Sequence, residues 1–221
     1  MIYRYKEKPS LEAPAETRSR TEIISHIEKH LGRIARVFQE SAPDAVRLDV
    51  QHVEPTAEFP CHRLITCGMS DLPMFFPEDI SSRYDLELMI TLPGDWRVDE
   101  ESLEDEKWNW PVRLMKELAR FPNKYNSWLC MGHTIPNSDP PEPYTSDSRL
   151  CCALLLPPVR SAQEFYTLEI PPDRKILFLA VVPIYEDEMN YKLEKGLAPL
   201  LEKFDQAGLD ELIDPKRASV V

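Results

Sequence analysis

The stretch "YDLELMITLPGDW", residues 84–96, carries the clearest strand pattern in the chain. Apolar or aromatic side chains occupy every second position: Tyr84, Leu86, Leu88, Ile90 and Leu92. A period of two places these side chains on one face of a β-strand. The "PGDW" that follows is typical of a turn. The stretch therefore predicts a strand that covers a hydrophobic core with one face.

Five other segments predict strands around it. They are "AVRLDVQHV" (45–53), "CHRLITCG" (61–68), "SWLCMGHTI" (127–135), "RLCCALLLP" (149–157) and "KILFLAVVPI" (175–184). In the first, apolar residues alternate with Arg47, Asp49 and Gln51, which indicates a half-exposed strand. The last two are nearly continuous apolar runs, which are typical of strands in the interior of a sheet.

Helical spacing of apolar residues appears near the start, in the middle and at the end of the chain. Ser19 and Glu22 form a capping-box pattern, and apolar residues recur at helical spacing from there to about Gln39. Further helices are predicted at "WNWPVRLMKELARF" (108–121) and within residues 186–215. Strands in runs, with helices between the runs, favour an α+β fold with a mixed, largely antiparallel sheet. We expect residues 1–18 to be a flexible arm and residues 19–221 to be a single domain.

The composition restricts the classes of partner. The chain has 221 residues, 26 Lys and Arg against 38 Asp and Glu, and a formal net charge of −12. Such a surface repels nucleic acid and attracts basic proteins, although acidity is also a common route to solubility. The first residues lack the apolar core of a signal peptide, and no apolar run is long enough to span a membrane. Five cysteines without disulfide-like spacing fit reduced thiols, so we expect a cytoplasmic protein.

The motifs of common cofactor enzymes are missing from the sequence. There is no glycine-rich phosphate loop, and the chain has six glycines in all. A G-x-S-x-G nucleophile elbow and an H-E-x-x-H metal motif are absent too. We therefore expect no cofactor and no enzymatic activity.

Cys130 and His133, in "WLCMGHTIPN" (128–137), raise two alternatives to that expectation. They could bind a metal ion together with Cys61, His62 or Cys67, although the spacing is not that of a zinc site. They could also act as nucleophile and base of a hydrolase, but two residues three apart on one extended strand point to opposite faces. That pairing would require a turn at Gly132. We interpret the segment as the end of a strand followed by a turn, with Cys130 packed inward.

Seven blocks in order resemble the suppressor of fused domain family, in particular its bacterial members. The blocks are "TCGMSDLPM", "YDLELMITLPGDW", "WPVRLMKELARFPN", "LCMGHTIPN", "SRLCCALLLPP", "FLAVVPIYEDEMNYKLEKG" and "LLEKF". The resemblance implies a non-enzymatic protein-binding domain that adds an extended peptide to a sheet as a strand. Similarity to bacterial members implies an immunity protein that neutralises a partner toxin. A peptide-binding regulator without a toxin is the alternative.

The resemblance also implies where a partner binds. The end of the helix at "LARF" and the segment after it correspond to peptide-contacting positions of the family, here Phe121, Leu129, Gly132 and His133. The eukaryotic pattern has an aspartate between the glycine and the histidine, which this chain lacks. Tyr185 and Glu188 are further candidates, because Tyr is favoured at interfaces and both begin a predicted helix.

Overall fold

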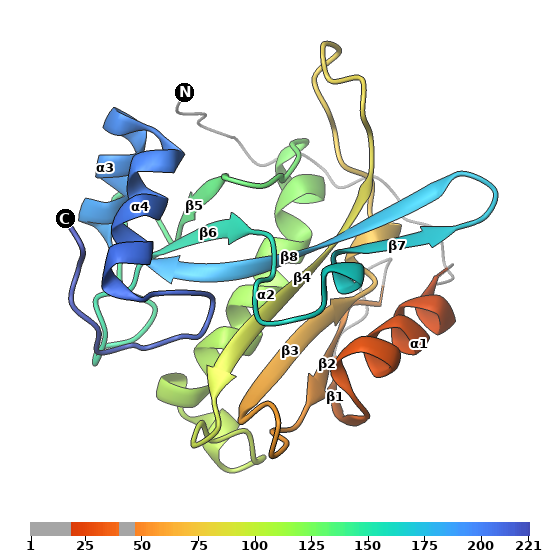
Figure 1. The fold of residues 1–221 in the computed structure, drawn as a ribbon, viewed down its shortest axis with the longest axis horizontal. Coiled ribbons are helices and arrows are strands. Elements are labelled where there is room, and N and C mark those ends of the chain that lie inside the picture. The colour runs from red at the N-terminus through yellow and green to blue at the C-terminus, as the bar shows by residue number, and fades with distance from the viewer. Residues whose placement is uncertain (1–18, 40–46) are drawn as a thin grey trace.

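The computed structural model describes residues 19–39 and 47–221, which form one mixed sheet covered by helices on both faces (Figure 1). The strands are β1 (Ile34–Phe38), β2 (Asp49–Val53), β3 (Cys61–Cys67), β4 (Asp85–Pro93), β5 (Thr134–Pro136), β6 (Cys152–Leu156), β7 (Thr167–Ile170) and β8 (Arg174–Ile184). The α-helices are α1 (Arg20–Leu31), α2 (Glu106–Tyr125), α3 (Glu186–Lys195) and α4 (Leu197–Ala207). Short 3-10 helices lie at Met69–Asp71, Ser102–Glu104 and Gln163–Tyr166.

The strand order is β1-β2-β3-β4-β8-β6-β5, and β7 pairs with β8 beside this path. Strands β4 and β8 run parallel, whereas the other strand pairs among the described residues are antiparallel. The predicted α+β fold is confirmed. Both apolar runs predicted to lie inside the sheet do so, since β6 and β8 each have a neighbour on either side.

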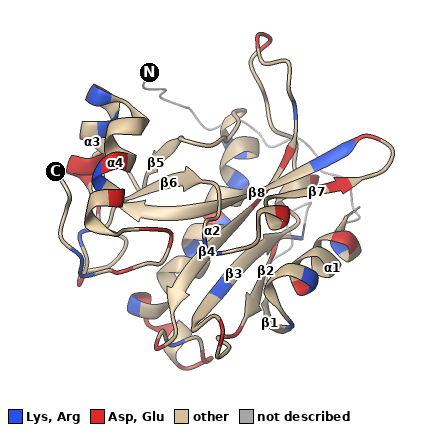
Figure 2. Cartoon of the chain, in the orientation of Figure 1, with Lys and Arg blue, Asp and Glu red and all other residues tan. Residues whose placement is uncertain are grey.

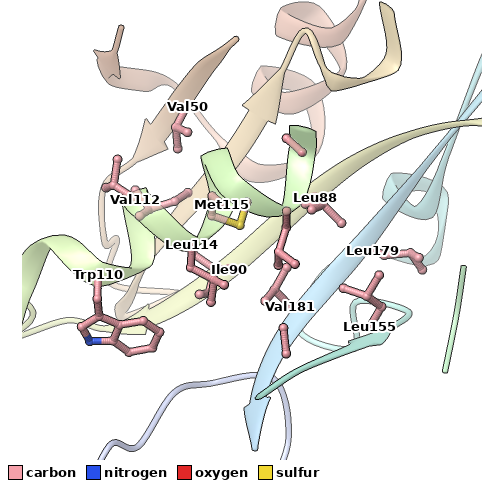
Figure 3. Packing of buried hydrophobic residues seen from close by; sticks show 14 of the residues in the cluster. Val50, Leu88, Ile90, Trp110, Val112, Leu114, Met115, Leu155, Leu179 and Val181 are labelled. Carbon is pink, nitrogen blue, oxygen red and sulfur yellow. The ribbon is translucent and has the colours of Figure 1, made fainter. Parts of the chain in front are cut away.

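Helix α2 covers one face of the sheet. The even-numbered residues of β4, including Leu88 and Ile90, point toward Met115 of α2, and Val181 of β8 joins them (Figure 3). Trp110 closes the same cluster near the start of the helix. The alternation read from residues 84–92 therefore corresponds to a buried face, as predicted.

The opposite face is covered by two separate groups of helices. Helix α1 packs on β3, β4 and the first half of β8 through a cluster that contains Ile27, Met89 and Phe178. Helices α3 and α4 cover β6 and the second half of β8, where Leu154 and Leu200 are buried together. Because both faces are covered, interior strands such as β4 are buried along almost their full length.

Two predictions near the N-terminal end of the sheet were wrong. The helix was expected to reach Gln39, but α1 ends at Leu31, and Gly32, with φ of 108°, starts the turn into β1. Ile34–Phe38 is a strand because it pairs with β2. The predicted capping box is not formed, since the Ser19 side chain caps nothing and accepts a hydrogen bond from Arg174.

Strand β2 is not half-exposed, as its alternation had predicted, but buried on both faces. Asp49 is fully buried and accepts hydrogen bonds from Arg20 of α1 and from Arg47. Gln51 is fully buried as well. The polar face of this strand is therefore covered by other elements of the fold. The alternation of residues within the strand does not reveal such cover.

Gly68, at the end of β3, allows two chain segments to approach each other closely. Its φ is 117°, and a Cβ added there would lie 2.4 Å from the backbone oxygen of Arg47. The Gly68 amide donates to the buried carboxylate of Glu87 at 3.1 Å, and Ser70 N donates to the same oxygen at 2.9 Å. The turn is thus fixed by steric fit and by a buried acceptor.

The five histidines share one electrostatic property. Burial lowers the pKa of each of them below the ordinary value of 6.5: His26, His30, His52, His62 and His133. The effect is largest at His52, where burial, with smaller contributions from His62 and Arg36, lowers the pKa to about 4. Its Nε2 lies 2.8 Å from His62 Nδ1.

Within the described residues, no helix combines the length and the apolar character needed to cross a bilayer. The arm predicted for residues 1–18 lies outside the described part of the chain.

Replacing Gly68 by Ala is expected to lower the free energy of unfolding by more than about 2 kcal/mol, because the new Cβ meets backbone that cannot move aside. The control is Gly208→Ala, at φ of 66° with nothing within 4 Å, which costs about 1 kcal/mol. Urea denaturation of both variants provides the comparison. Equal losses would contradict the steric explanation.

The pH dependence of stability is expected to depend on His52. Because its folded pKa lies below that of the unfolded chain, the unfolded state binds more protons below about pH 6.5, and the free energy of unfolding falls as the pH decreases toward 4. His52→Phe should reduce the loss between pH 7 and pH 5 by up to about 2 kcal/mol. His30→Phe, at a more exposed site, is the control and should change the loss less. If His52→Phe loses as much stability between pH 7 and pH 5 as the wild type, His52 is not the cause of the pH dependence.

Candidate partner-binding groove

A groove of about 570 Å³ lies at the β5 edge of the sheet. One wall is the C-terminal end of α2, with Phe121 and Tyr125 in ring contact at 4.8 Å between centroids. The other wall comes from α3 and α4, with Lys192 and Leu193 of α3 among its residues. Figure 1 shows β5 between these helices. A further hollow of about 390 Å³ adjoins it along α2 and shares Ile135.

Strand β5 forms the floor of the groove and pairs with β6 along one side only. Leu155 N donates to His133 O at 3.0 Å, Ile135 pairs with Ala153, and Asn137 N donates to Cys151 O at 2.8 Å. In an antiparallel pair the bonded positions alternate. The backbone groups of Thr134 and Pro136 therefore point away from β6, toward the open side of the sheet.

The two faces of β5 are directed toward different walls of the groove. Thr134 pairs with Leu154, which belongs to the cluster under α3 and α4. Ile135 packs against the cluster under α2. A strand added to this edge would therefore place successive side chains alternately toward α3 and toward α2.

A tight turn precedes β5, within the segment 127–135 that the sequence had predicted to be a strand ending in a turn. The strand prediction was wrong for residues 127–133, but the turn is present: Gly132 has φ of 81° and donates to Leu155 O at 2.7 Å, while His133 N donates to Cys130 O at 3.1 Å. A Cβ on Gly132 would lie 3.0 Å from Leu197 Cδ2 of α4. The turn and α4 are thus closely packed.

The His133 side chain lies inside the groove. Its ring centroid is 5.3 Å from that of Trp128, in an edge-on arrangement. Burial lowers its pKa, Lys192 lowers it further, and a hydrogen bond to the Trp128 backbone acts in the opposite direction. The imidazole is therefore neutral at pH 7.

Cys130 does not have the properties of an activated nucleophile. Its thiol donates to Met131 O at 3.4 Å, and burial raises its pKa, although Lys192 acts in the opposite direction. A nucleophilic cysteine requires the opposite shift, toward thiolate. Among residues 19–39 and 47–221, no three or more His, Cys, Asp or Glu side chains form a group that could hold a metal ion.

The predicted site residues divide into two groups. Phe121, Leu129 and His133 line the groove, and Gly132 shapes the turn at its end. Tyr185 and Glu188 are buried elsewhere, at the start of α3, and do not line it.

Tyr185 and Glu188 belong to a buried ion-pair network with Arg217. The two guanidinium nitrogens of Arg217 each donate to one Glu188 oxygen at 2.6 Å. Tyr185 N donates to Glu188 at 3.0 Å, and Arg217 lies over the Tyr185 ring at 4.7 Å. This network fixes the C-terminal segment to α3.

Lys192 is one of several groove residues that sequence reasoning missed, and it is the cation among them. It is half-buried, and its Nζ donates to Thr134 Oγ1 at 3.2 Å. The available signal was its place in α3, three residues after Met189 and one before Leu193, which puts a cation in an apolar stripe.

Comparisons with known proteins agree on one family. The sequence matches the family described as "Suppressor of fused protein (SUFU)" over residues 44–218. A crystal structure described as a SUFU homolog from Neisseria gonorrhoeae FA 1090 has 21% identity and a TM-score of 0.64, and the match covers 91% of this chain and 96% of that one. No curated protein sequence gave a significant match.

Two further solved structures share the fold. The Sufu-Fu complex structure matches with 17% identity and a TM-score of 0.63, covering 94% of this chain and 93% of that one. Drosophila Suppressor of Fused matches with 17% identity and a TM-score of 0.60 over 98% of this chain, which spans 52% of that structure.

Glu188→Gln is expected to lower the free energy of unfolding by about 2 to 4 kcal/mol, because it leaves the buried Arg217 guanidinium without its counter-charge. Partner binding should remain once the protein is folded. Denaturation and binding measured on the same preparation separate the two effects. Unchanged stability with lost binding would instead assign Glu188 to an interface.

Proposed function

The chain belongs to the suppressor of fused family, and we propose that it captures an extended segment of a partner protein as an added strand on β5. The observation that carries the proposal is the β5 edge, whose Thr134 and Pro136 backbone groups point into a groove. In β-augmentation, main-chain hydrogen bonds supply affinity and the walls supply specificity. The Sufu-Fu structure is of a complex, which supports a protein partner here.

The groove has the composition of a peptide site. Its walls combine aromatic residues, such as Phe121 and Trp128, with the half-exposed apolar residue Leu193. Aromatic anchors of this kind contribute strongly to interfaces. His133 is neutral, so it can exchange hydrogen bonds with a peptide without introducing a charge.

The finer proposal is that the partner is a basic toxin domain and that this chain is its immunity protein. The net charge of −12 supports it, since complementary charge accelerates association and makes the rate depend on salt. The fold shared with the Neisseria homolog is consistent with a bacterial member. A regulator that binds a peptide without a toxin would use the same groove.

Co-expression with a toxin encoded beside this gene is the test of function. The wild-type chain should restore growth, and Thr134→Pro should abolish protection, because it removes the outward-facing amide and lowers affinity at least about tenfold. Thr134→Val keeps the amide and is the matched control. Thermal denaturation must show that both variants are folded.

Three outcomes decide between the alternatives. Protection that survives Thr134→Pro would contradict strand addition at β5. A partner that is not toxic, and whose binding is lost in Thr134→Pro, would support the alternative of a peptide-binding regulator. Hydrolytic activity lost in a folded Cys130→Ser variant would instead favour the enzyme alternative.

A further inference from the structure

Lys192 is a cation without an anionic partner inside an otherwise apolar wall. Its Nζ donates to the Thr134 hydroxyl at 3.2 Å, and no carboxylate among the described residues forms an ion pair with it. Burial lowers its pKa. A half-buried ammonium group gains much from a carboxylate that replaces its lost water.

We propose that the partner segment carries an Asp or Glu side chain at the strand position opposite Thr134, where it forms an ion pair with Lys192. This inference rests on the proposed strand addition at β5, and it defines the chemistry of the segment that the groove accepts.

The register of the sheet determines that position. Side chains directly opposite each other on paired strands lie on the same face, with Cβ atoms about 4.5–5.5 Å apart. Thr134 faces α3, and its hydroxyl already contacts Lys192 Nζ. A carboxylate opposite Thr134 therefore lies within reach of the same ammonium group.

The positions on either side of the acidic residue face the other wall. A strand alternates its faces, so these side chains point toward α2, where Phe121 and Tyr125 present aromatic surface. The expected pattern is apolar–acidic–apolar. The hollow that adjoins the groove along α2 leaves room for a large apolar side chain.

The charge around the groove is mixed. Strand β5 carries no charged residue, as Figure 2 shows, and the groove lining includes one cation, Lys192, and one carboxylate, Asp139, which do not form an ion pair. Arg120 and Lys124 of α2 line the adjoining hollow together with Glu117. An acidic side chain in the segment is thus compatible with a partner that is basic as a whole.

Selection from a displayed library of random eight-residue segments, each followed by a fixed linker, tests the inference with the full chain as bait. The linker prevents a terminal carboxylate from substituting for a side chain. Wild-type protein should enrich segments with Asp or Glu at one position between apolar residues. Changing that residue to Asn or Gln in a selected segment should weaken binding about tenfold or more.

Variants of α3 provide the controls. Lys192→Met should abolish the acidic preference and keep the apolar one, and Lys192→Glu should shift the preference to Lys or Arg. Lys195→Met, on the same helix but outside the groove and beside Glu194, should leave the preference unchanged. Thermal denaturation of each variant confirms folding.

The outcomes separate the inference from the function on which it rests. Two results would overturn the ion pair and leave strand addition intact. In the first, the selected segments lose binding to Thr134→Pro protein but show no acidic preference. In the second, the acidic preference survives Lys192→Met. If no segment binds, or if binding is insensitive to Thr134→Pro, both proposals fail.

Discussion

Strand β8 pairs with three neighbouring strands, and this pairing determines where the helices and the groove lie. The first half of β8 pairs in parallel with β4 and antiparallel with β7, and the second half pairs with β6. It carries apolar side chains on both faces, so α2 covers one side while α1 and the α3–α4 pair share the other. Without this strand the groove edge would have no attachment to the main core.

Much of the fold could be predicted from the sequence, because a buried face requires apolar residues at a regular spacing within each segment. The alternation in β4 identified a strand and its core-facing side, and the apolar runs of β6 and β8 identified interior strands. The predictions that were wrong concern features that depend on contacts between residues distant in the sequence. The buried Asp49 requires Arg20 of α1, and the end of α1 at Leu31 is followed by pairing of β1 with β2.

Part of the candidate groove lies where the family resemblance indicated positions, and the rest of its lining depends on tertiary contacts. Phe121, Leu129 and His133 reach the groove because the helix end and the turn converge on β5. The turn at Gly132 agrees with the sequence, but the strand expected before it is absent, since the apolar residues around Gly132 have the pattern of a strand without pairing as one. Lys192 lies about 60 residues farther along the chain, and only the docking of α3 against β6 brings it to Thr134.

Pro136 has a consequence for what can happen at the open edge of the sheet. Pro136 lacks an amide hydrogen, so of the two residues whose backbone faces the open side, only Thr134 offers a hydrogen-bond donor. Edges that are long, flat and fully hydrogen-bonding allow copies of a protein to polymerise edge to edge. The β5 edge is only three residues long, ends in proline and lies between helices, so it is too short to serve as a template for open-ended stacking of copies into fibres.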